Sequence, residues 1–273
     1  MEENDKYLAI SCLSDVGRRR ENNEDSFLYI RLSGEDGHSG YLMAVADGMG
    51  GHQAGEVASR RLVDVLKEYV ASNPVEDNNI PKLLKDAITE ANRSIYETAG
   101  KTPELTGMGT TCTALVLAQG RANIAHVGDS RAYLVRRYKA RKLTKDHTVA
   151  ERMMESGIMS PEEAKICPER NILLRAVGTN SDVEVDLVPP IDIIPGDVLV
   201  LCSDGLTEFV EEDEIAEIVN LYPPGRACQV MINIANNRGG TDNITVLVVQ
   251  VLGSSIGTSR IVSGIKSLFD RIK

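Results

Sequence analysis

The sequence predicts an α+β sandwich, and three patterns lead to that fold class. Short segments rich in β-forming residues recur along the chain, and several are apolar almost throughout, which is typical of strands buried on both faces. Two longer segments with helical periodicity follow one another with no strand between them, and a second such pair lies late in the chain. Because strands are grouped with strands and helices with helices, a sandwich is favoured over an alternating parallel sheet.

The individual elements follow from these patterns. The consecutive helical segments predict an antiparallel helix pair lying on a sheet, and the late pair is expected near residues 212–222 and 225–237. In the first helix of the early pair the apolar face consists of Val57, Leu62, Val65, Leu66 and Tyr69; in the second it consists of Leu83, Leu84, Ala87, Ile88, Ala91 and Ile95. The expected strands cover residues 7–13, 26–32, 41–47, 111–118, 122–129, 131–137, 197–204 and 243–252.

Composition and charge narrow the function classes. The 273 residues are 42% hydrophobic and 26% charged, as in a folded globular protein. A net charge of −10 disfavours nucleic acid or an anionic membrane as the main partner. The five cysteines are odd in number and scattered, which indicates reduced, buried thiols. With no signal peptide and no transmembrane segment in the sequence, we expect a cytoplasmic protein.

Two segments stand apart from the strands and helices. Residues 146–182 are polar and interrupt the strands, and within them Ser160 is an expected N-cap with Pro161 at the first helical position. Residues 253–273 are first small and polar, then basic and amphipathic. This tail either packs on itself or docks on a partner or a membrane surface as a helix. The predicted domain is therefore residues 1–252, followed by the tail.

Acidic residues gather where strands begin or end. Asp47, in "AVADGMGGH", and Asp204, in "VLCSDGL", each follow an apolar run and precede a glycine. Asp-Gly alone is an ordinary turn pair, but the joint pattern is less easily accidental. If one sheet edge collects these carboxylates they repel one another, and a cation is the natural compensation. The other acids of this kind are Glu24, Asp25, Asp129 and Asp242.

The ligand types indicate which cation this would be. Carboxylate and carbonyl oxygens suit Mg²⁺ or Mn²⁺ better than zinc, and the four histidines form no metal-ligand pattern. Two such ions about 3.5–4 Å apart turn a bridging water into a nucleophile and clamp a phosphoryl group. The arginines of "GRRREN" suit a phosphate. No P-loop, G-x-S-x-G or C-x5-R motif is present.

Seven motifs, in order, resemble the metal-dependent type 2C Ser/Thr protein phosphatases (the PPM family), most closely the compact bacterial members. The resemblance covers roughly residues 7–251, and the motifs are "RENNEDS", "ADGMGGHQAGEVAS", "GMGTTCTALVL", "HVGDSRAYL", "LTKDHT", "LCSDGLTEFV" and "GGTDNITVLVV". The resemblance implies a four-layer α-β-β-α sandwich, with two mainly antiparallel sheets flanked by helix pairs. It also implies hydrolysis of phosphoserine and phosphothreonine in proteins by a metal-bridged water at a dinuclear Mn²⁺ or Mg²⁺ centre.

Site residues are implied by position within these motifs. Asp47 would bridge both metals and so serve catalysis directly, and the Gly48 carbonyl would be a ligand, because a bare glycine lets the backbone approach the ion. Asp204 and Asp242 would complete one metal, and Glu24 would hold the other through water.

The remaining roles implied by the resemblance lie around this centre. Asp25 would be a supporting acid, and Asp129 with Asp204 matches a third, weaker metal site. Arg20 matches the catalytic, phosphate-binding arginine, with Arg18 and Arg19 as alternatives if the register shifts. The polar excursion matches the family's flap, which is expected to influence substrate choice.

One departure concerns the general acid. Animal members carry a histidine where this chain has Met49, and methionine cannot donate a proton; bacterial relatives also carry methionine there. Leaving-group protonation must then come from a metal-bound water or another group. His52 is a candidate, although a histidine that stabilises the turn is the simpler interpretation.

Three functions are open at this point. The first is a phosphoprotein phosphatase that opposes a cognate Ser/Thr kinase. For this enzyme we expect no nucleic-acid partner, and a monomer is favoured. The second is a metallohydrolase of a small phosphorylated metabolite. The third is a non-catalytic signalling module on the same fold, which the complete acid set disfavours.

Overall fold

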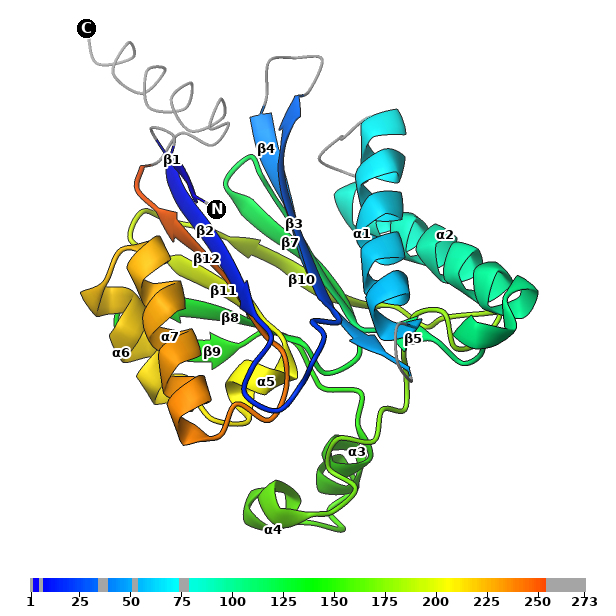
Figure 1. Cartoon of the computed structure of the whole chain (residues 1–273). Helices are drawn as coiled ribbons and strands as arrows, with labels where there is room; N and C mark the ends of the chain where they lie inside the picture. Colours follow the sequence, from blue (N-terminus) through cyan, green and yellow to red (C-terminus); the bar gives the residue numbers. More distant parts are fainter. Residues whose placement is uncertain (1, 5–6, 34–38, 51–53, 74–78, 254–273) are drawn as a thin grey trace, which may run out of the picture.

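The computed structural model describes residues 2–4, 7–33, 39–50, 54–73 and 79–253. Within them, two antiparallel sheets pack face to face, with one helix pair on each outer face (Figure 1). This four-layer α-β-β-α arrangement confirms the predicted fold class. The tail from residue 254 onward and His52 lie outside the described residues.

The first sheet has the strand order β1-β2-β12-β11-β8-β9. The second has the order β10-β7-β6-β4-β3, with the short β5 paired to β4. The strands of the first are β1 (Glu2–Asn4), β2 (Leu8–Asp15), β12 (Ile244–Val251), β11 (Val198–Cys202), β8 (Arg131–Arg136) and β9 (Lys139–Lys142). Those of the second are β10 (Asp186–Asp192), β7 (Arg121–Val127), β6 (Cys112–Ala118), β4 (Ser39–Met49), β3 (Asp25–Ser33) and β5 (Gly109–Thr110).

The central strands are buried on both faces, as their continuous apolar runs predict. In β4, Met43 and Val45 point into the core between the sheets, whereas Leu42 and Ala44 pack toward the outer helices. β12 alternates in the same way between the inter-sheet core and the other helix pair. A charge on either face of these strands would be buried, so polar chemistry is confined to their ends.

The first helix pair, α1 (Ala54–Ser72) and α2 (Ile80–Lys101), covers the β4 sheet. The buried stripe of α1 begins with Ala54, Ala58 and Leu62. Val57 is not part of this stripe, because it precedes Leu62 by five residues and so lies about 140° from it around the helix. Val57 is 36% exposed, so its assignment to the apolar face was wrong. The short η1 (Pro103–Leu105) follows α2.

The second pair, α6 (Glu212–Leu221) and α7 (Pro224–Arg238), covers the β12 sheet and follows the single turn α5 (Asp204–Thr207). All five cysteines are buried and free, as expected. Among the described residues, no helix has both the length and the apolar character needed to cross a membrane.

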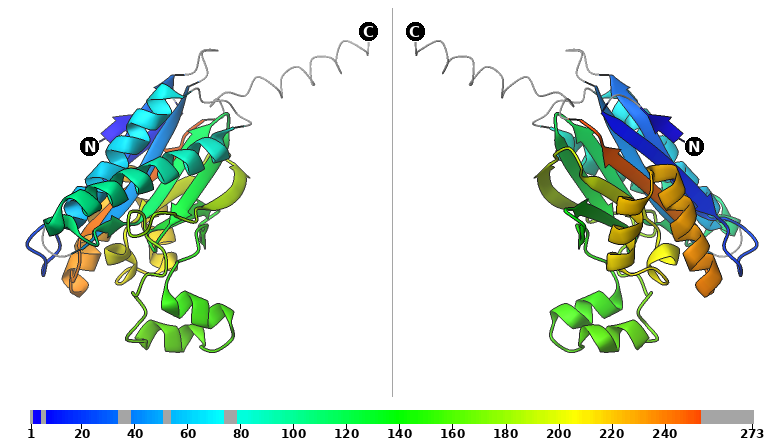
Figure 2. Two further views of the ribbon diagram at one scale, coloured as in Figure 1. Left: turned by 90° about the vertical axis from the view of Figure 1, so that its right-hand side faces the viewer. Right: turned by 90° about the vertical axis from the view of Figure 1, so that its left-hand side faces the viewer.

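The polar excursion forms two short helices, α3 (Val149–Glu155) and α4 (Pro161–Ile166), that project beyond the sandwich (Figure 2). Ser160 caps α4 in a capping box with Glu163, and Pro161 occupies the first turn, as predicted. Backbone hydrogen bonds join the two roots of the excursion, from Val149 N to Ile172 O and from Leu174 N to His147 O. We call residues 146–182 the flap.

Candidate active site

Asp47 lies near the end of β4, although the strand does not stop there as the Asp-Gly pair suggested. It continues to Met49, because Gly48 and Met49 pair with β5. A Cβ on Gly48 would lie 2.2 Å from Gly55 O and 2.5 Å from Glu24 O. Glycine is therefore required at residue 48 because two other backbone segments approach it directly.

Both sheets contribute acids to the surroundings of Asp47. Asp25 is its cross-strand partner in β3, and Asp129 sits in the turn between β7 and β8. Asp204 begins α5, and Asp242 lies two residues before β12. Burial raises the pKa of Asp47 well above its ordinary value, and the negative charges of the other four acids raise it further. The structure thus brings these five predicted residues within electrostatic reach of one another.

Two carboxylate oxygens at this site are buried without a hydrogen-bond partner, Asp25 Oδ1 and Asp204 Oδ1. The other Asp25 oxygen accepts a hydrogen bond from Ser203 Oγ at 2.8 Å. Burial raises the pKa of Asp25 to about 7. The Asp204 pKa is raised by burial first and by Asp242 second. Buried acceptors left unpaired are uncommon and need an explanation.

A divalent cation would provide that explanation. The donor set is all oxygen, as Mg²⁺ and Mn²⁺ prefer, and a cation would offset the mutual repulsion of the acids. Among the described residues, however, no three His, Cys, Asp or Glu side chains form a ready metal-holding group. Protein partners occupy other carboxylate oxygens instead: Asp242 accepts from Arg20, and Asp25 from Ser203. The residues fit a cation in charge and donor type, and binding would exchange these partners.

Glu24 and Arg20 lie on the loop between β2 and β3. The Glu24 backbone is held on both sides: its N–H donates to Asn243 Oδ1 at 2.7 Å, and its carbonyl accepts from Gly48 N and Ser59 Oγ. Burial raises the pKa of the Glu24 carboxyl, and the Arg20 charge opposes that rise. Arg20 Nη2 donates to Asp242 Oδ2 at 2.8 Å.

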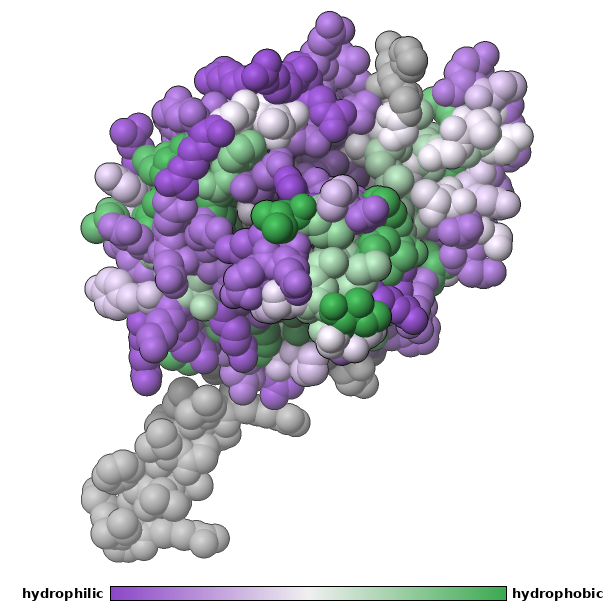
Figure 3. Space-filling view, turned by 90° about the horizontal axis from the view of Figure 1, so that it is seen from below, coloured by the Kyte–Doolittle hydropathy of each residue, from purple (hydrophilic) through white to green (hydrophobic). Residues whose placement is uncertain are grey.

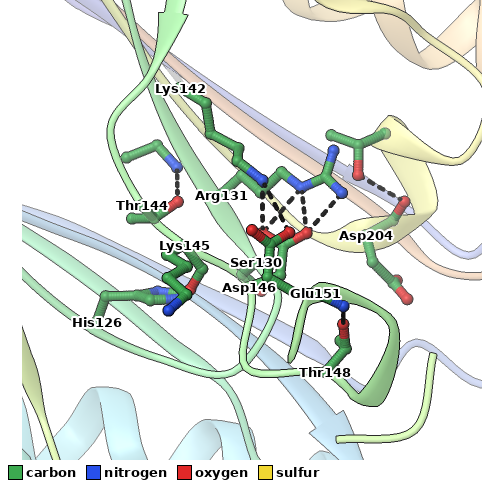
Figure 4. A network of polar contacts seen from close by, with 12 residues as sticks. His126, Ser130, Arg131, Lys142, Thr144, Lys145, Asp146, Thr148, Glu151 and Asp204 are labelled. Atoms are coloured by element: carbon green, nitrogen blue, oxygen red, sulfur yellow. Dashed lines mark hydrogen bonds and ion pairs between the residues drawn. The ribbon is translucent and has the colours of Figure 1, made fainter. Parts of the chain in front are cut away.

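An ion-pair network joins Arg131, at the start of β8, to the root of the flap (Figure 4). Two residues after Asp129, Arg131 holds the Asp146 carboxylate with both Nε and Nη2, at distances from 2.6 to 3.1 Å. Lys142 contacts Asp146 and reaches Glu151 in α3. Arg131 and Asp146 lie inside recognised motifs, but sequence reasoning assigned them no role. The sequence did place an arginine at the start of an apolar strand. A buried charge there needs an acidic partner, and this was the signal that could have pointed to Asp146.

A cavity of about 570 Å³ separates the flap from the acids; its lining includes Asp129, Asp204, Met154 and Glu208. Glu208 was not singled out from the sequence, yet it accepts from Arg170 of the flap at 2.6 Å and from Thr241 at 2.7 Å. Figure 3 views the side on which the flap projects and shows hydrophobic groups within a largely hydrophilic face. A polar cavity open beside a carboxylate cluster suits a charged substrate.

Comparison with known proteins decides the family. Residues 12–153 match the model of protein phosphatase 2C. The chain belongs to this family. It is 42% identical over 243 residues to the serine/threonine phosphatase stp of Listeria monocytogenes, covering 87% of this chain and 93% of that protein. Its activity is therefore that of a protein Ser/Thr phosphatase.

Solved structures agree with this assignment. The serine/threonine phosphatase of S. agalactiae superposes with a TM-score of 0.83 at 37% identity, over 90% of this chain and 100% of that one. The catalytic domain of the phosphatase PstP, in complex with two manganese ions, has a TM-score of 0.79 at 35% identity, over 90% of this chain and 99% of that one. Phosphorylated proteins are accordingly the substrates of the phosphatase described here.

Proposed function

We propose that this phosphatase hydrolyses phosphoserine and phosphothreonine at a centre of two divalent cations, Mn²⁺ or Mg²⁺, held where the sheets deliver their acids. The observation that carries the proposal is the pair of buried, unpartnered oxygens on Asp25 and Asp204, beside an Asp47 whose pKa is raised by four neighbouring carboxylates. When bound, such ions act as Lewis acids that activate water and neutralise phosphate charge.

We assign five groups that would hold the cations: the side chains of Asp47, Asp204, Asp242 and Glu24, and the Gly48 carbonyl. Asp25, the cross-strand partner of Asp47, supports the set from β3. The manganese ions reported for PstP favour Mn²⁺. Asp129, whose pKa is raised by burial and by Asp204, provides with Asp204 a third and weaker cation site.

Arg20 is assigned to the phosphate of the substrate. Its side chain is 49% exposed and donates from Nη2 to Asp242 Oδ2, which places the guanidinium beside the acid cluster. A guanidinium holds a phosphate by two parallel hydrogen bonds. Met49 donates no proton, and protonation of the leaving group falls to another group in the site.

The same proposal covers the organisation of the chain. Residues 1–252 form the catalytic domain, the flap takes part in substrate choice, and residues 253–273 are a separate tail. The enzyme acts as a cytoplasmic monomer that reverses the work of a cognate Ser/Thr kinase.

The decisive test is hydrolysis of a phosphothreonine peptide by metal-stripped protein titrated with Mn²⁺. Saturable activation that is lost in Asp204→Asn supports the proposal, because that residue carries an unpartnered oxygen. Sugar phosphates, run in parallel, test the alternative of a small metabolite as substrate, and faster turnover of these would favour it. Tight phosphopeptide binding without turnover would favour a non-catalytic module.

A further inference from the structure

The loop between β2 and β3 carries both Arg20 and Glu24, yet apolar packing does not hold it. Every residue from 18 to 22 is exposed. The loop lies at the end of the sandwich from which the flap projects (Figure 1). Its position relative to the other acids therefore depends on hydrogen bonds.

One side chain supplies three of these bonds. Asn243, 4% exposed, donates from Nδ2 to the carbonyls of Val16 and Asn22, both at 2.9 Å. Its Oδ1 accepts from the N–H of Glu24 at 2.7 Å. Both amide protons and the carbonyl oxygen are thus used on the two ends of one loop.

The same residue also contacts the acid beside it. The Asn243 N–H donates to Asp242 Oδ1 at 2.8 Å, while Arg20 occupies Oδ2. The backbones meet directly, since Arg18 N donates to Gly240 O at 2.7 Å. Gly17, at φ +83°, leaves so little room that a Cβ would lie 2.2 Å from Asp242 O.

We propose that Asn243 is the positioning residue that keeps Arg20 and Glu24 in register with Asp242. The inference rests on the proposed function of those three residues. The three side-chain hydrogen bonds of Asn243 all go to the backbone of the loop, so it acts through the loop. Without its side chain, the loop loses the hydrogen bonds at Val16 O, Asn22 O and Glu24 N–H. The Glu24 carbonyl keeps its bonds from Gly48 and Ser59, so the exposed stretch that carries Arg20 is the part that is released.

Asn92 provides a matched control. It is 1% exposed and also makes three hydrogen bonds, accepting from Gly178 N and donating to the carbonyls of Asn180 and Ser181. These bonds fix the C-terminal end of the flap, at residues 178–181, and involve none of the residues assigned to cations or phosphate. Asn92→Ala therefore reproduces the structural cost of losing a buried amide without releasing the Arg20 loop.

The experiment compares Asn243→Ala, Asn92→Ala and wild type, each with and without Arg20→Ala. We expect Asn243→Ala to raise KM for a phosphothreonine peptide roughly tenfold or more, as for the loss of a charged hydrogen bond, with a smaller change in kcat. In the Asn243→Ala background, Arg20→Ala should raise KM little further, because the effects of coupled residues are not additive. In the Asn92→Ala background, Arg20→Ala should raise KM by as much as it does in the wild type.

Hydrogen exchange of the metal-free proteins gives a second readout that needs no activity. Exchange of residues 16–24 should accelerate in Asn243→Ala and stay unchanged in Asn92→Ala. If Asn243→Ala does not fold, Asn243→Asp takes its place. This variant keeps the acceptor for the Glu24 N–H but replaces the donor to the Val16 and Asn22 carbonyls with an oxygen that repels them.

Full additivity with Arg20→Ala, or equal exchange of residues 16–24 in both asparagine variants, would overturn the positioning role. Absence of Mn²⁺-stimulated hydrolysis in the wild type would instead overturn the proposed function. In that case the exchange comparison still decides whether Asn243 holds the loop.

Discussion

Nη2 of Arg20 lies 2.8 Å from Oδ2 of Asp242, so the side chain assigned to phosphate is paired with one assigned to a cation. The pair is partly exposed, with 49% of the arginine and 29% of the aspartate side chain accessible. Exposed pairs contribute little to stability, commonly about 0–1 kcal/mol. The pair matters because it competes with ligand binding. A cation that binds Asp242 displaces Arg20 from it, and a phosphate that binds Arg20 displaces Asp242.

The first prediction concerns Arg20→Ala. We expect KM for a phosphopeptide to rise roughly 10- to 100-fold, as for the loss of a hydrogen bond to a charged group. The Mn²⁺ concentration for half-activation should fall, because Asp242 no longer has a competing guanidinium. Arg20→Lys should recover part of the affinity, since an ammonium lacks the bidentate fork. Steady-state kinetics across a Mn²⁺ titration measures both effects.

Arg18→Ala and Arg19→Ala serve as controls for the register of the motif. The described contact of Arg18 with Gly240 uses its backbone N–H, which survives the substitution. A KM rise in either of these variants, with Arg20→Ala unaffected, would move the phosphate role to that arginine.

The second prediction concerns Asp204→Asn and metal removal. We expect kcat to fall by more than roughly 100-fold, because even outer partners of metal ligands cost 10–100-fold. The variant should fold, since asparagine has the same shape and removes one of several repelling buried acids. Mn²⁺ at 100 times its Kd should raise the Tm of wild type by roughly 5–10 °C and that of the variant by much less. An active variant, or an unfolded one, contradicts this.

The layers of the fold were predictable because burial on both faces leaves a continuous apolar run, as in β6 and β11. The acids were predictable because each lies near a strand end, and three of them, Asp47, Asp129 and Asp204, are next to a glycine. Gly48 shows why: the approach of other backbone segments excludes a side chain there.

The supporting residues were not predictable, for a physical reason. Asn243 bonds to Glu24, 219 positions away, and Glu208 to Arg170, 38 positions away. A single polar residue that belongs to no helical or strand periodicity does not reveal, in the sequence, a partner so far along the chain. The same holds for Asp146, whose burial against Arg131 follows from how the flap root meets β8. Such polar pairs can be identified only once the tertiary structure shows the two residues in contact.

The third prediction concerns acid pH and His126. This imidazole is buried in β7, and its Nε2 donates to Lys145 O at 3.0 Å, which fixes the proton on that nitrogen. Burial, then the neighbouring His147, lowers its pKa to about 4. The unfolded chain, with a histidine pKa of about 6.5, binds the proton more readily between these values. The contribution of His126 to stability is therefore full above about pH 6.5 and is lost, by about 3 kcal/mol, as the pH drops toward 4.

His126→Gln isolates this contribution. The variant is less stable at pH 7.5, because it loses buried hydrogen bonds, but its free energy of unfolding should decline less between pH 6.5 and 4 than that of wild type. Denaturant titrations at four pH values measure the difference. Parallel pH profiles for the two proteins would mean that His126 already titrates normally in the folded state.

The fourth prediction concerns the ion pair between Arg170 of the flap and Glu208, with Nη2 and Oε1 2.6 Å apart. Arg170→Ala should lower stability by less than about 1 kcal/mol, because the pair is partly exposed. It should nevertheless raise KM for a phosphopeptide, since the flap loses a link across the cavity, while hydrolysis of p-nitrophenyl phosphate changes less than about twofold. Arg152→Ala is the matched control: this arginine lies on α3, is exposed, and has no ion pair among the described residues. If both variants affect both substrates alike, the Arg170–Glu208 pair does not distinguish protein substrates from small ones.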